Sequence, residues 1–429
     1  MNTFIHPSKE KWTEILKRPY ADQGNIVQDV QHILDEVKKN GDEAVRTFAR
    51  KFDGVEVGDL LVREEEIQNA GTKLPEKLKI AIRQANKNII KFHKAQVITE
   101  DKIETMSGVM CWRKSVPIEK VGLYIPGGTA PLFSTVLMLA TPAQLAGCKE
   151  VILCTPCSKD ETIHPAILFA AQLAGVNKIF KTGGAQAIAA MAYGTESIPA
   201  VYKIFGPGNQ YVTTAKQLVQ QSGIAIDMPA GPSEVCVLAD ETADPAFIAA
   251  DLLSQAEHGK DSQVVLITFS SSLLENVNKE LENQLADLPR RNIAEKSLEN
   301  SLAIEVKTID EAIELLNLYA AEHLIICCRN ADEVSEKVIN AGSVFIGNYS
   351  PESAGDYASG TNHTLPTNGF ARAYSGVSID SFIKKITFQK LSETGLKNIG
   401  TTIIEMAEAE GLWAHGNAIR IRNEKLSSR

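Results

Sequence analysis

The sequence predicts an α/β protein with two mainly parallel sheets and small helical segments at both ends. From about residue 109, short β-rich runs alternate with helical stretches, and this alternation occurs in two successive blocks. Before that point, apolar residues recur every three or four positions, which is the spacing of amphipathic helices. Because repeated strand, helix and strand units form parallel sheets, we expect helices to cover the faces of both sheets.

The individual elements follow from this pattern in chain order. The part of the chain before about residue 109, called the head here, has predicted amphipathic helices at 8–18, 26–40, 42–52 and 75–97. Gly41 and Pro75 separate these helices. The first block has predicted strands at 121–125, 150–154, 178–181 and 202–205, with helices near 131–147, 163–175, 185–193 and 209–222. The second block has predicted strands at 234–238, 263–268, 303–306, 324–328 and 343–346. Two α/β units with a cleft between them are the expected architecture.

The composition is typical of a globular protein. The 429 residues are 44% hydrophobic and 23% charged, and the formal net charge of −9 disfavours nucleic acid and anionic membranes as partners. The first residues lack the pattern of a secretory signal, and no apolar run reaches transmembrane length. Seven cysteines without the spacing of a disulfide scaffold favour reduced thiols, so we expect a cytoplasmic location.

Glycine clusters follow three predicted strands of the first block and precede helices. They occupy residues 124–128 (Tyr-Ile-Pro-Gly-Gly), 182–186 (Thr-Gly-Gly-Ala-Gln) and 205–209 (Phe-Gly-Pro-Gly-Asn). Such loops lie at the carboxyl ends of strands and let backbone amides approach phosphate. The dinucleotide fingerprint is absent, because Tyr211 stands where GxGxxG requires its third glycine. A nucleotide cleft and ordinary tight turns both stay open on these residues.

Gln255 and His258 lie three residues apart at the end of an apolar helix that is predicted to begin at Pro245. Both side chains can point the same way, and the negative end of the helix dipole favours a cation there. The pair indicates a metal site if further ligands exist elsewhere. Otherwise the two residues only form hydrogen bonds at a helix end.

Further reactive groups occur in the second block and the tail. Glu322 and His323 are adjacent; an imidazole can take a proton near neutral pH, and a desolvated glutamate can activate water. The alternative for this pair is a solvated helix end. A polar, glycine-rich loop carries Asp356 and His363 and is a typical place for ligands. His415 lies beyond the tail helix, where a lone histidine is usually a capping or surface residue.

In order and spacing, these segments resemble histidinol dehydrogenases over nearly the whole chain. The resemblance rests on Tyr-Ile-Pro-Gly-Gly, Gly-Gly-Ala-Gln, Gly-Pro-Gly-Asn, Gly-Pro-Ser-Glu, Gln-Ala-Glu-His, Glu-His-Leu, Gly-Asp-Tyr-Ala-Ser-Gly-Thr-Asn-His and His-Gly-Asn. It implies two incomplete Rossmann-like domains with small helical accessory domains. It also implies a zinc-dependent enzyme of histidine biosynthesis that oxidises L-histidinol to L-histidinal and then to L-histidine with two NAD.

The resemblance also implies roles for individual residues. One zinc ion per subunit would orient the amino group and imidazole of histidinol, and its ligands would be Gln255, His258, Asp356 and His415. His323 would be the general base, and Glu322 would activate the water that hydrates the aldehyde. Substrate contacts would be Ser233, Gln255, His258, His323, Asp356, His363, Glu410 and His415. NAD contacts would be Tyr124, Gln186 and Asn209.

The family is a homodimer with shared active sites, in which the tail crosses to the neighbouring subunit. The resemblance therefore implies that Glu410 and His415 complete the site of the second subunit. It also implies a division into an N-terminal helical extension (1–21), a catalytic zinc domain (22–123 and 234–377), an NAD-binding domain (124–233) and a C-terminal helical tail (378–429).

The chain departs from the family pattern at two places without losing any of these groups. Ala321 replaces a proline that many members carry before Glu-His, and Cys327 and Cys328 are unusual after it. Two other functions stay open. One is an aldehyde dehydrogenase in which Cys148 or Cys154 forms a thiohemiacetal. The other is a catalytically silent zinc-binding or nucleotide-binding protein.

Overall fold

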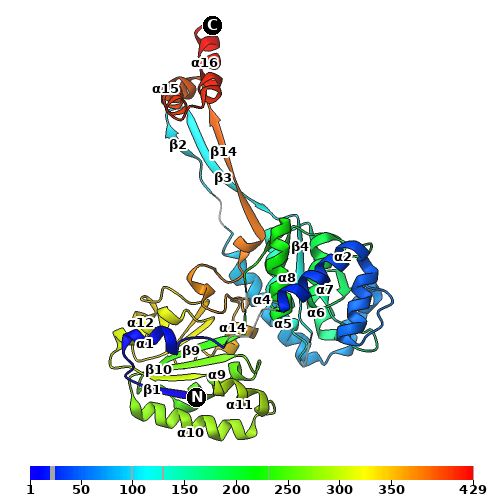
Figure 1. The fold of residues 1–429 in the computed structure, drawn as a ribbon, viewed down its shortest axis with the longest axis vertical. Coiled ribbons are helices and arrows are strands. Elements are labelled where there is room, and N and C mark those ends of the chain that lie inside the picture. The colour runs from blue at the N-terminus through cyan, green and yellow to red at the C-terminus, as the bar shows by residue number, and fades with distance from the viewer. Residues whose placement is uncertain (20–24, 98–99, 128–129, 230, 429) are drawn as a thin grey trace. The chain divides into compact units, whose positions relative to one another are not determined.

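A computed structural model describes residues 1–19, 25–97, 100–127, 130–229 and 231–428 (Figure 1). The chain forms two compact units. The first consists of residues 1–96 and 118–382, and the second consists of residues 97–117 and 383–429. Gly128, which ends the first predicted glycine loop, lies outside the described residues, as does the expected domain boundary after residue 21.

The first unit contains a five-stranded parallel sheet in the order β6-β5-β4-β7-β8. Its strands are β4 (Lys120–Tyr124), β5 (Glu150–Thr155), β6 (Lys178–Lys181), β7 (Lys203–Phe205) and β8 (Ala225–Ile226). The four strands predicted for the first block are confirmed, and only the two-residue β8 was not expected. The chain runs from β4 outward through β5 and β6, and then returns to β7 on the other side of β4. This reversal is the topological switch point at which open α/β sheets bind ligands.

Helices cover both faces of this sheet, because successive side chains of a strand point to opposite faces. Val121 and Leu123 pack with one group of helices: α3 (Glu64–Asn69), α4 (Glu76–Lys94), α5 (Phe133–Ala146) and α6 (Pro165–Leu173). Ile152 and Cys154 pack with the other group: α2 (Ile26–Phe48), α7 (Gly184–Tyr193) and α8 (Gln210–Val219). The head helices α2 and α4, expected in the same domain as the second block, thus place their apolar faces against the first sheet.

A six-stranded parallel sheet in the order β1-β11-β10-β9-β12-β13 forms the rest of the first unit. Its strands are β1 (Asn2–Ile5), β9 (Glu234–Ala239), β10 (Gln263–Thr268), β11 (Leu302–Glu305), β12 (His323–Cys327) and β13 (Ser343–Ile346). All five strands predicted for the second block are confirmed. The expectation of a wholly helical N-terminal extension is wrong, because residues 2–5 pair in register with β11. Only long-range pairing stabilises so short an edge strand.

The two faces of the second sheet are also covered by helices (Figure 1). One face packs against α9 (Pro245–Ala256), α10 (Ser271–Asp287) and α11 (Arg291–Glu299). The other packs against α1 (Lys9–Ile15) and α12 (Ile309–Tyr319). Short helices α13 (Ala331–Ser335) and α14 (Glu352–Tyr357) follow β12 and β13. Asp244 caps α9 by accepting a hydrogen bond from the Ala246 amide at 2.9 Å, and Pro245 occupies its first turn.

The second unit is a three-stranded antiparallel sheet with two helices. Its strands are β2 (Ile103–Met106), β3 (Val109–Pro117) and β14 (Ile383–Leu391), and its helices are α15 (Glu393–Ala409) and α16 (Trp413–Ser427). The expected tail is therefore not wholly helical, because residues 383–391 pair with β3 along their whole length. Phe388 and Trp112 stack across this pair with their ring centroids 5.4 Å apart.

Among the described residues, none of the helices is both long enough and apolar enough to cross a membrane. All seven cysteines are free thiols, and five of them are buried.

The stacked pair of Phe205 and Phe382 yields a test of the fold. Phe382 is fully buried, and its ring lies 4.1 Å from that of Phe205, at the end of the first unit. We expect Phe382→Ala to lower the free energy of unfolding by about 3–5 kcal/mol, because the lost ring leaves a cavity. Phe388→Ala removes a stacked but 37% exposed ring and should cost clearly less. Denaturant titration measures both; equal losses would contradict the packing described.

Candidate active site

Parallel pairing of β12 with β9 places Glu322 and His323 side by side in the interior. His323 begins β12 and lies opposite Val235. The preceding helix α12 ends at Tyr319, and the φ of +55° at the next residue, Ala320, turns the chain toward the strand. Glu322 is 6% exposed and His323 is 3% exposed, so the two predicted catalytic residues are buried. The alternative of a solvated helix end for this pair is wrong.

The backbone of Glu234, at the start of β9, contacts both predicted catalytic side chains. Its amide donates a hydrogen bond to Glu322 Oε2 at 2.9 Å, and its carbonyl lies 3.2 Å from His323 Nδ1. The other ring nitrogen, Nε2, lies 3.3 Å from Asp356 Oδ1 but has no hydrogen-bond partner among the described residues. A protonated Nδ1 leaves Nε2 as the atom that can exchange a proton with a ligand.

Negative charge is concentrated around the His323 ring. Burial alone would lower the pKa of His323, but the carboxylates of Glu322, Asp356 and Glu352 outweigh it and raise this pKa to about 10. Burial raises the pKa of Glu322 to about 7 and that of Glu352 to about 8. For Asp356, burial alone would raise the pKa, but the neighbouring His323 ring outweighs burial and lowers this pKa. The pocket therefore favours groups that carry positive charge.

Gln255 lies on α9 beside this pair and is 1% exposed. In the amide orientation that satisfies both ends, its nitrogen donates to Glu352 Oε1 at 3.1 Å and its oxygen accepts from the Glu234 amide at 3.2 Å. Glu352, which also accepts a hydrogen bond from Ser254 at 2.7 Å, was not identified from the sequence. Nothing in the sequence pattern around Glu352 indicates a buried carboxylate.

His258 is exposed and follows α9, which ends at Ala256. The expectation that Gln255 and His258 both lie on the helix is therefore wrong.

The sequence predicts Asp356 on a loop, but this residue lies on the short helix α14. His363 does lie on the loop that follows. Its Nδ1 is 2.9 Å from the Asp356 carbonyl, and its Nε2 is 3.0 Å from Thr135 Oγ1 on α5. Both ring nitrogens of His363 therefore already have partners, and the residue connects the two sheets of the first unit.

The donor set can be tested for a metal ion on chemistry alone. In the part of the chain that the structure describes, no three His, Cys, Asp or Glu side chains are grouped as a metal site requires. Gln255, His258 and Asp356 contribute only two side chains of those types, and the third is an amide. Amide oxygen, imidazole and carboxylate are nevertheless donors that bind Zn²⁺. The first unit can thus provide part of such a site, and a further ligand is needed.

A small cavity of about 50 Å³ connects these residues to the first sheet. The predicted residues Ser233, Glu322 and His363 line it, together with Gly206 and Pro207 of the loop after β7. The structure therefore places a glycine loop of the first sheet and the predicted catalytic glutamate on one cavity. This shared lining supports the expected cleft between the two α/β blocks.

The three predicted NAD positions lie where strands of the first sheet end. Tyr124 ends β4, and its buried hydroxyl, whose pKa burial raises to about 12, accepts a hydrogen bond from the Gly184 amide at 3.1 Å. Gln186 is 1% exposed on α7, and neither atom of its amide has a partner among the described residues. Asn209 caps α8 through its oxygen. The unpaired amide of Gln186 fits a site that a ligand completes.

The loop after β7 approaches β4 too closely for any side chain. Gly206 has φ of +128°, and a Cβ atom there would lie 2.0 Å from the Tyr124 carbonyl oxygen. The Gly206 amide donates to Asp227 at 2.8 Å, and its carbonyl accepts from Lys216 at 2.8 Å. Lys216 and Asp227 also form a buried ion pair with each other. Both polar groups of Gly206 are thus held by charged residues.

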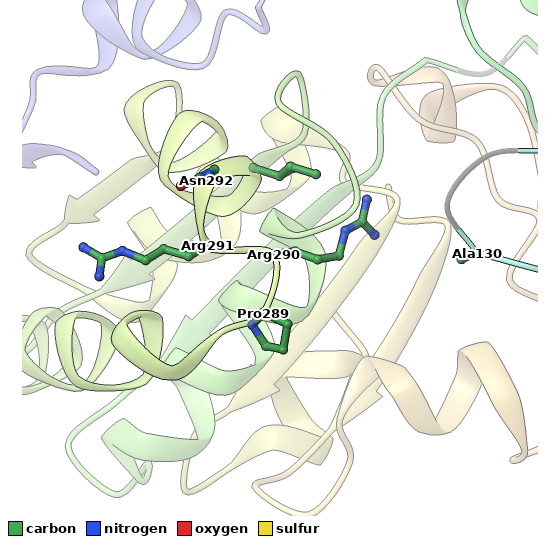
Figure 2. Close-up of a pocket in the computed structure, with 6 residues that line it drawn as sticks. Ala130, Pro289, Arg290, Arg291 and Asn292 are labelled. Carbon is green, nitrogen blue, oxygen red and sulfur yellow. The ribbon is translucent and has the colours of Figure 1, made fainter.

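A larger cavity of about 520 Å³ is lined by Ala130 and by residues 289–293, at the start of α11. Figure 2 shows the Arg290 side chain pointing toward Ala130 and that of Arg291 pointing away from it. Of the predicted site residues that the structure describes, none lines this cavity.

Glu410 and His415 belong to the second unit. Glu410 follows α15, His415 lies in the first turn of α16, and both side chains are exposed.

The two cysteines considered as nucleophiles are poorly suited to that role. Burial raises the pKa of the Cys148 thiol to about 11 and raises that of Cys154 further. Thiolate is the reactive form, so both side chains are suited to packing in the core. This observation counts against the aldehyde dehydrogenase alternative.

Comparisons with known proteins agree with these motifs. Residues 16–423 match the family model described as histidinol dehydrogenase. A histidinol dehydrogenase from Bacteroides thetaiotaomicron is 63% identical over 426 residues, which cover 99% of this chain and 100% of that protein. One from Vibrio vulnificus is 52% identical over 425 residues, covering 98% of each.

A solved structure agrees as well. The crystal structure of histidinol dehydrogenase from Elizabethkingia anophelis has a TM-score of 0.97 and 53% identity to this chain. The alignment covers 100% of this chain and 99% of the other.

Asp251, one turn before Gln255 on α9, gives a prediction for the pH dependence of stability. Burial raises its pKa to about 7, so the folded state binds its proton more tightly than the unfolded state does. The stability of the folded protein that depends on protonated Asp251 is therefore lost as the pH rises from about 4 to 7. We expect Asp251→Asn to stabilise the protein by roughly 1–3 kcal/mol more at pH 8 than at pH 5. Thermal unfolding at both pH values, with the exposed Asp287→Asn as control, measures this difference; equal effects at both would contradict it.

Proposed function

The chain belongs to the histidinol dehydrogenase family of oxidoreductases, and we propose that it oxidises L-histidinol to L-histidine through L-histidinal with two NAD. The main support is the buried pair of Glu322 and His323, which lies beside Asp356. Glu322 also lines a cavity that it shares with the glycine loop after β7. A glutamate that shares a cavity with a glycine loop, and an imidazole next to that glutamate, are groups that both oxidations require.

In this proposal His323 is the general base, which requires the neutral ring; a cation held by the neighbouring carboxylates would lower the pKa that they raise. Its Nδ1 faces the Glu234 carbonyl, and this contact leaves Nε2 toward the substrate. Nε2 accepts the hydroxyl proton as the hydride leaves the carbon atom. Glu322, whose pKa burial raises, takes a proton from the water that hydrates the aldehyde. His323 returns its proton to the former carbonyl oxygen as the water adds, and can then accept the proton of the hydrate while the second NAD takes the hydride. Both groups thus act as bases, on different oxygen atoms.

We propose Gln255, His258, Asp356 and His415 as ligands of one Zn²⁺ ion per subunit. The ion would supply a fixed positive charge that orients the amino alcohol. The carboxylates around His323 favour a bound cation. Glu352 can accept a hydrogen bond from the Gln255 amide nitrogen, and this orientation keeps the amide oxygen as a ligand atom for the metal ion. Ser233, His363 and Glu410 would contact the substrate, and Tyr124, Gln186 and Asn209 would contact NAD.

We further propose a homodimer in which Glu410 and His415 complete the site of the second subunit. The exposure of both side chains supports this, because it leaves them open to contact with a second subunit. The second unit also exposes large apolar side chains that a second copy could cover: Ile103, Met406, Leu412, Trp413 and Ile421. We also propose a cytoplasmic location and the division into four domains that the family resemblance implies.

A direct test is NADH formation from L-histidinol. We expect the zinc-loaded protein to form two NADH per histidinol consumed, a chelator to abolish the reaction, and added Zn²⁺ to restore it. Absorbance at the NADH band with product analysis measures the ratio. Absence of turnover at saturating zinc and NAD would exclude the proposed function, and turnover unaffected by complete metal removal would exclude the metal.

The roles within the site can be separated by substitution. We expect His323→Asn to lower kcat by about 10²–10⁴-fold while zinc content stays near that of the unchanged protein, because a base is lost and no ligand is. His32→Asn, an exposed histidine on α2, serves as control and should change neither quantity. Steady-state rates and metal analysis measure the two effects. A parallel loss of zinc and rate would instead assign His323 to the metal.

A further inference from the structure

A buried ion pair beside the site joins the N-terminal segment to β9. Arg18 Nε lies 2.5 Å from Glu234 Oε1, and Arg18 Nη2 lies 2.9 Å from Oε2. The side chain of Arg18 is 15% exposed and that of Glu234 is 3% exposed. Two parallel N–H to oxygen contacts form the bidentate geometry that a planar guanidinium provides and a lysine does not. None of the roles assigned above uses this pair.

Glu234 is the residue whose backbone contacts both Glu322 and His323. Its amide and carbonyl lie 2.9 Å from Glu322 Oε2 and 3.2 Å from His323 Nδ1. Its carboxylate also accepts a hydrogen bond from the Asn368 amide at 2.9 Å, in the segment that follows His363. The position of this one residue therefore affects the orientation of both proposed bases.

Arg18 also contacts the segment that leads into β12. Its Nη2 donates to the Tyr319 carbonyl at 2.8 Å, and its guanidinium lies 4.2 Å from the centroid of the Tyr319 ring. Tyr319 is the last residue of α12 and lies three residues before Glu322. The buried Tyr319 hydroxyl donates to Gln263 Oε1 at 2.9 Å, which fixes the ring under the guanidinium. One arginine thus connects the start of β9 with the approach to β12.

We propose that Arg18 is a positioning residue for the proposed reaction, acting through Glu234 and Tyr319 to hold Glu322 and His323 in their reactive orientation. This inference rests on the proposed function. The guanidinium fixes two backbone segments at once, so a displacement of either moves a proposed base relative to the substrate. Small displacements of reacting groups lower turnover strongly, while cofactor binding at the other sheet is unaffected.

Arg18→Lys tests this proposal, because it keeps the charge and loses the bidentate contact. We expect kcat for histidinol oxidation by the zinc-loaded protein to fall about 10–100-fold per folded site, with KM for NAD and zinc content changed less than about two-fold. Arg50→Lys is the matched control. Arg50 Nε also lies 2.5 Å from a glutamate oxygen, that of Glu56, but this pair is exposed, and the substitution should leave kcat unchanged.

The double variant Arg18→Gln with Glu234→Gln covers the case in which Arg18→Lys does not fold. This double variant leaves no unpaired buried charge, so we expect it to fold. It also lacks the bidentate contact of the guanidinium, so we expect the same low kcat. A wild-type kcat in either folded variant would overturn the proposal, as would a loss of rate that only follows the loss of folded protein. If the unchanged chain itself fails to oxidise histidinol, the proposed function fails and this inference with it. An active unchanged chain with an equally active Arg18→Lys variant overturns the inference alone.

Discussion

The parallel pairing of β9 with β12 is the interaction on which the candidate site depends. Its register sets His323 opposite Val235 and brings the backbone of Glu234 against both proposed bases. A shift of one residue would turn every side chain of β12 to the opposite face of the sheet. The core prevents such a shift, because the apolar side chains of β12 pack into helices on both faces. Packing far from the chemistry thus fixes where the chemistry can occur.

Burial of several carboxylates around one imidazole is costly, and no ordinary packing role explains it. Glu322, Glu352 and Asp356 surround His323, and burial raises the pKa values of both glutamates. Proteins tolerate such groupings where their altered proton affinity is used. Glu234 and Gln255, which lie next to these groups, are themselves oriented by hydrogen bonds, to Arg18 and to Glu352 respectively. The site is preorganised at the expense of stability.

Periodicity was sufficient to predict nine strands of the two parallel sheets, because each is a nearly continuous apolar run between helices. It was not sufficient for β1 and β8 in these sheets, nor for β2, β3 and β14 in the second unit. Residues 2–5 are too few to show a pattern, and β14 carries lysines that mask its alternation. Within the site, adjacency in sequence indicated Glu322 and His323. The contact of Arg18 with Glu234 spans 216 residues and left no local signal. Contacts of that kind arise only when the chain is folded.

The ribbon of β3 and β14 in the second unit has a consequence for how the chain can be divided. The two strands come from segments separated by more than 260 residues and pair along nine positions. A protein ended at Phe382 would therefore keep β3 with a row of unsatisfied backbone groups along one edge. Such an edge is a template for pairing with other chains. Truncation would turn a well-formed antiparallel sheet into an aggregation-prone hairpin, so the C-terminal segment is an integral part of the folded protein.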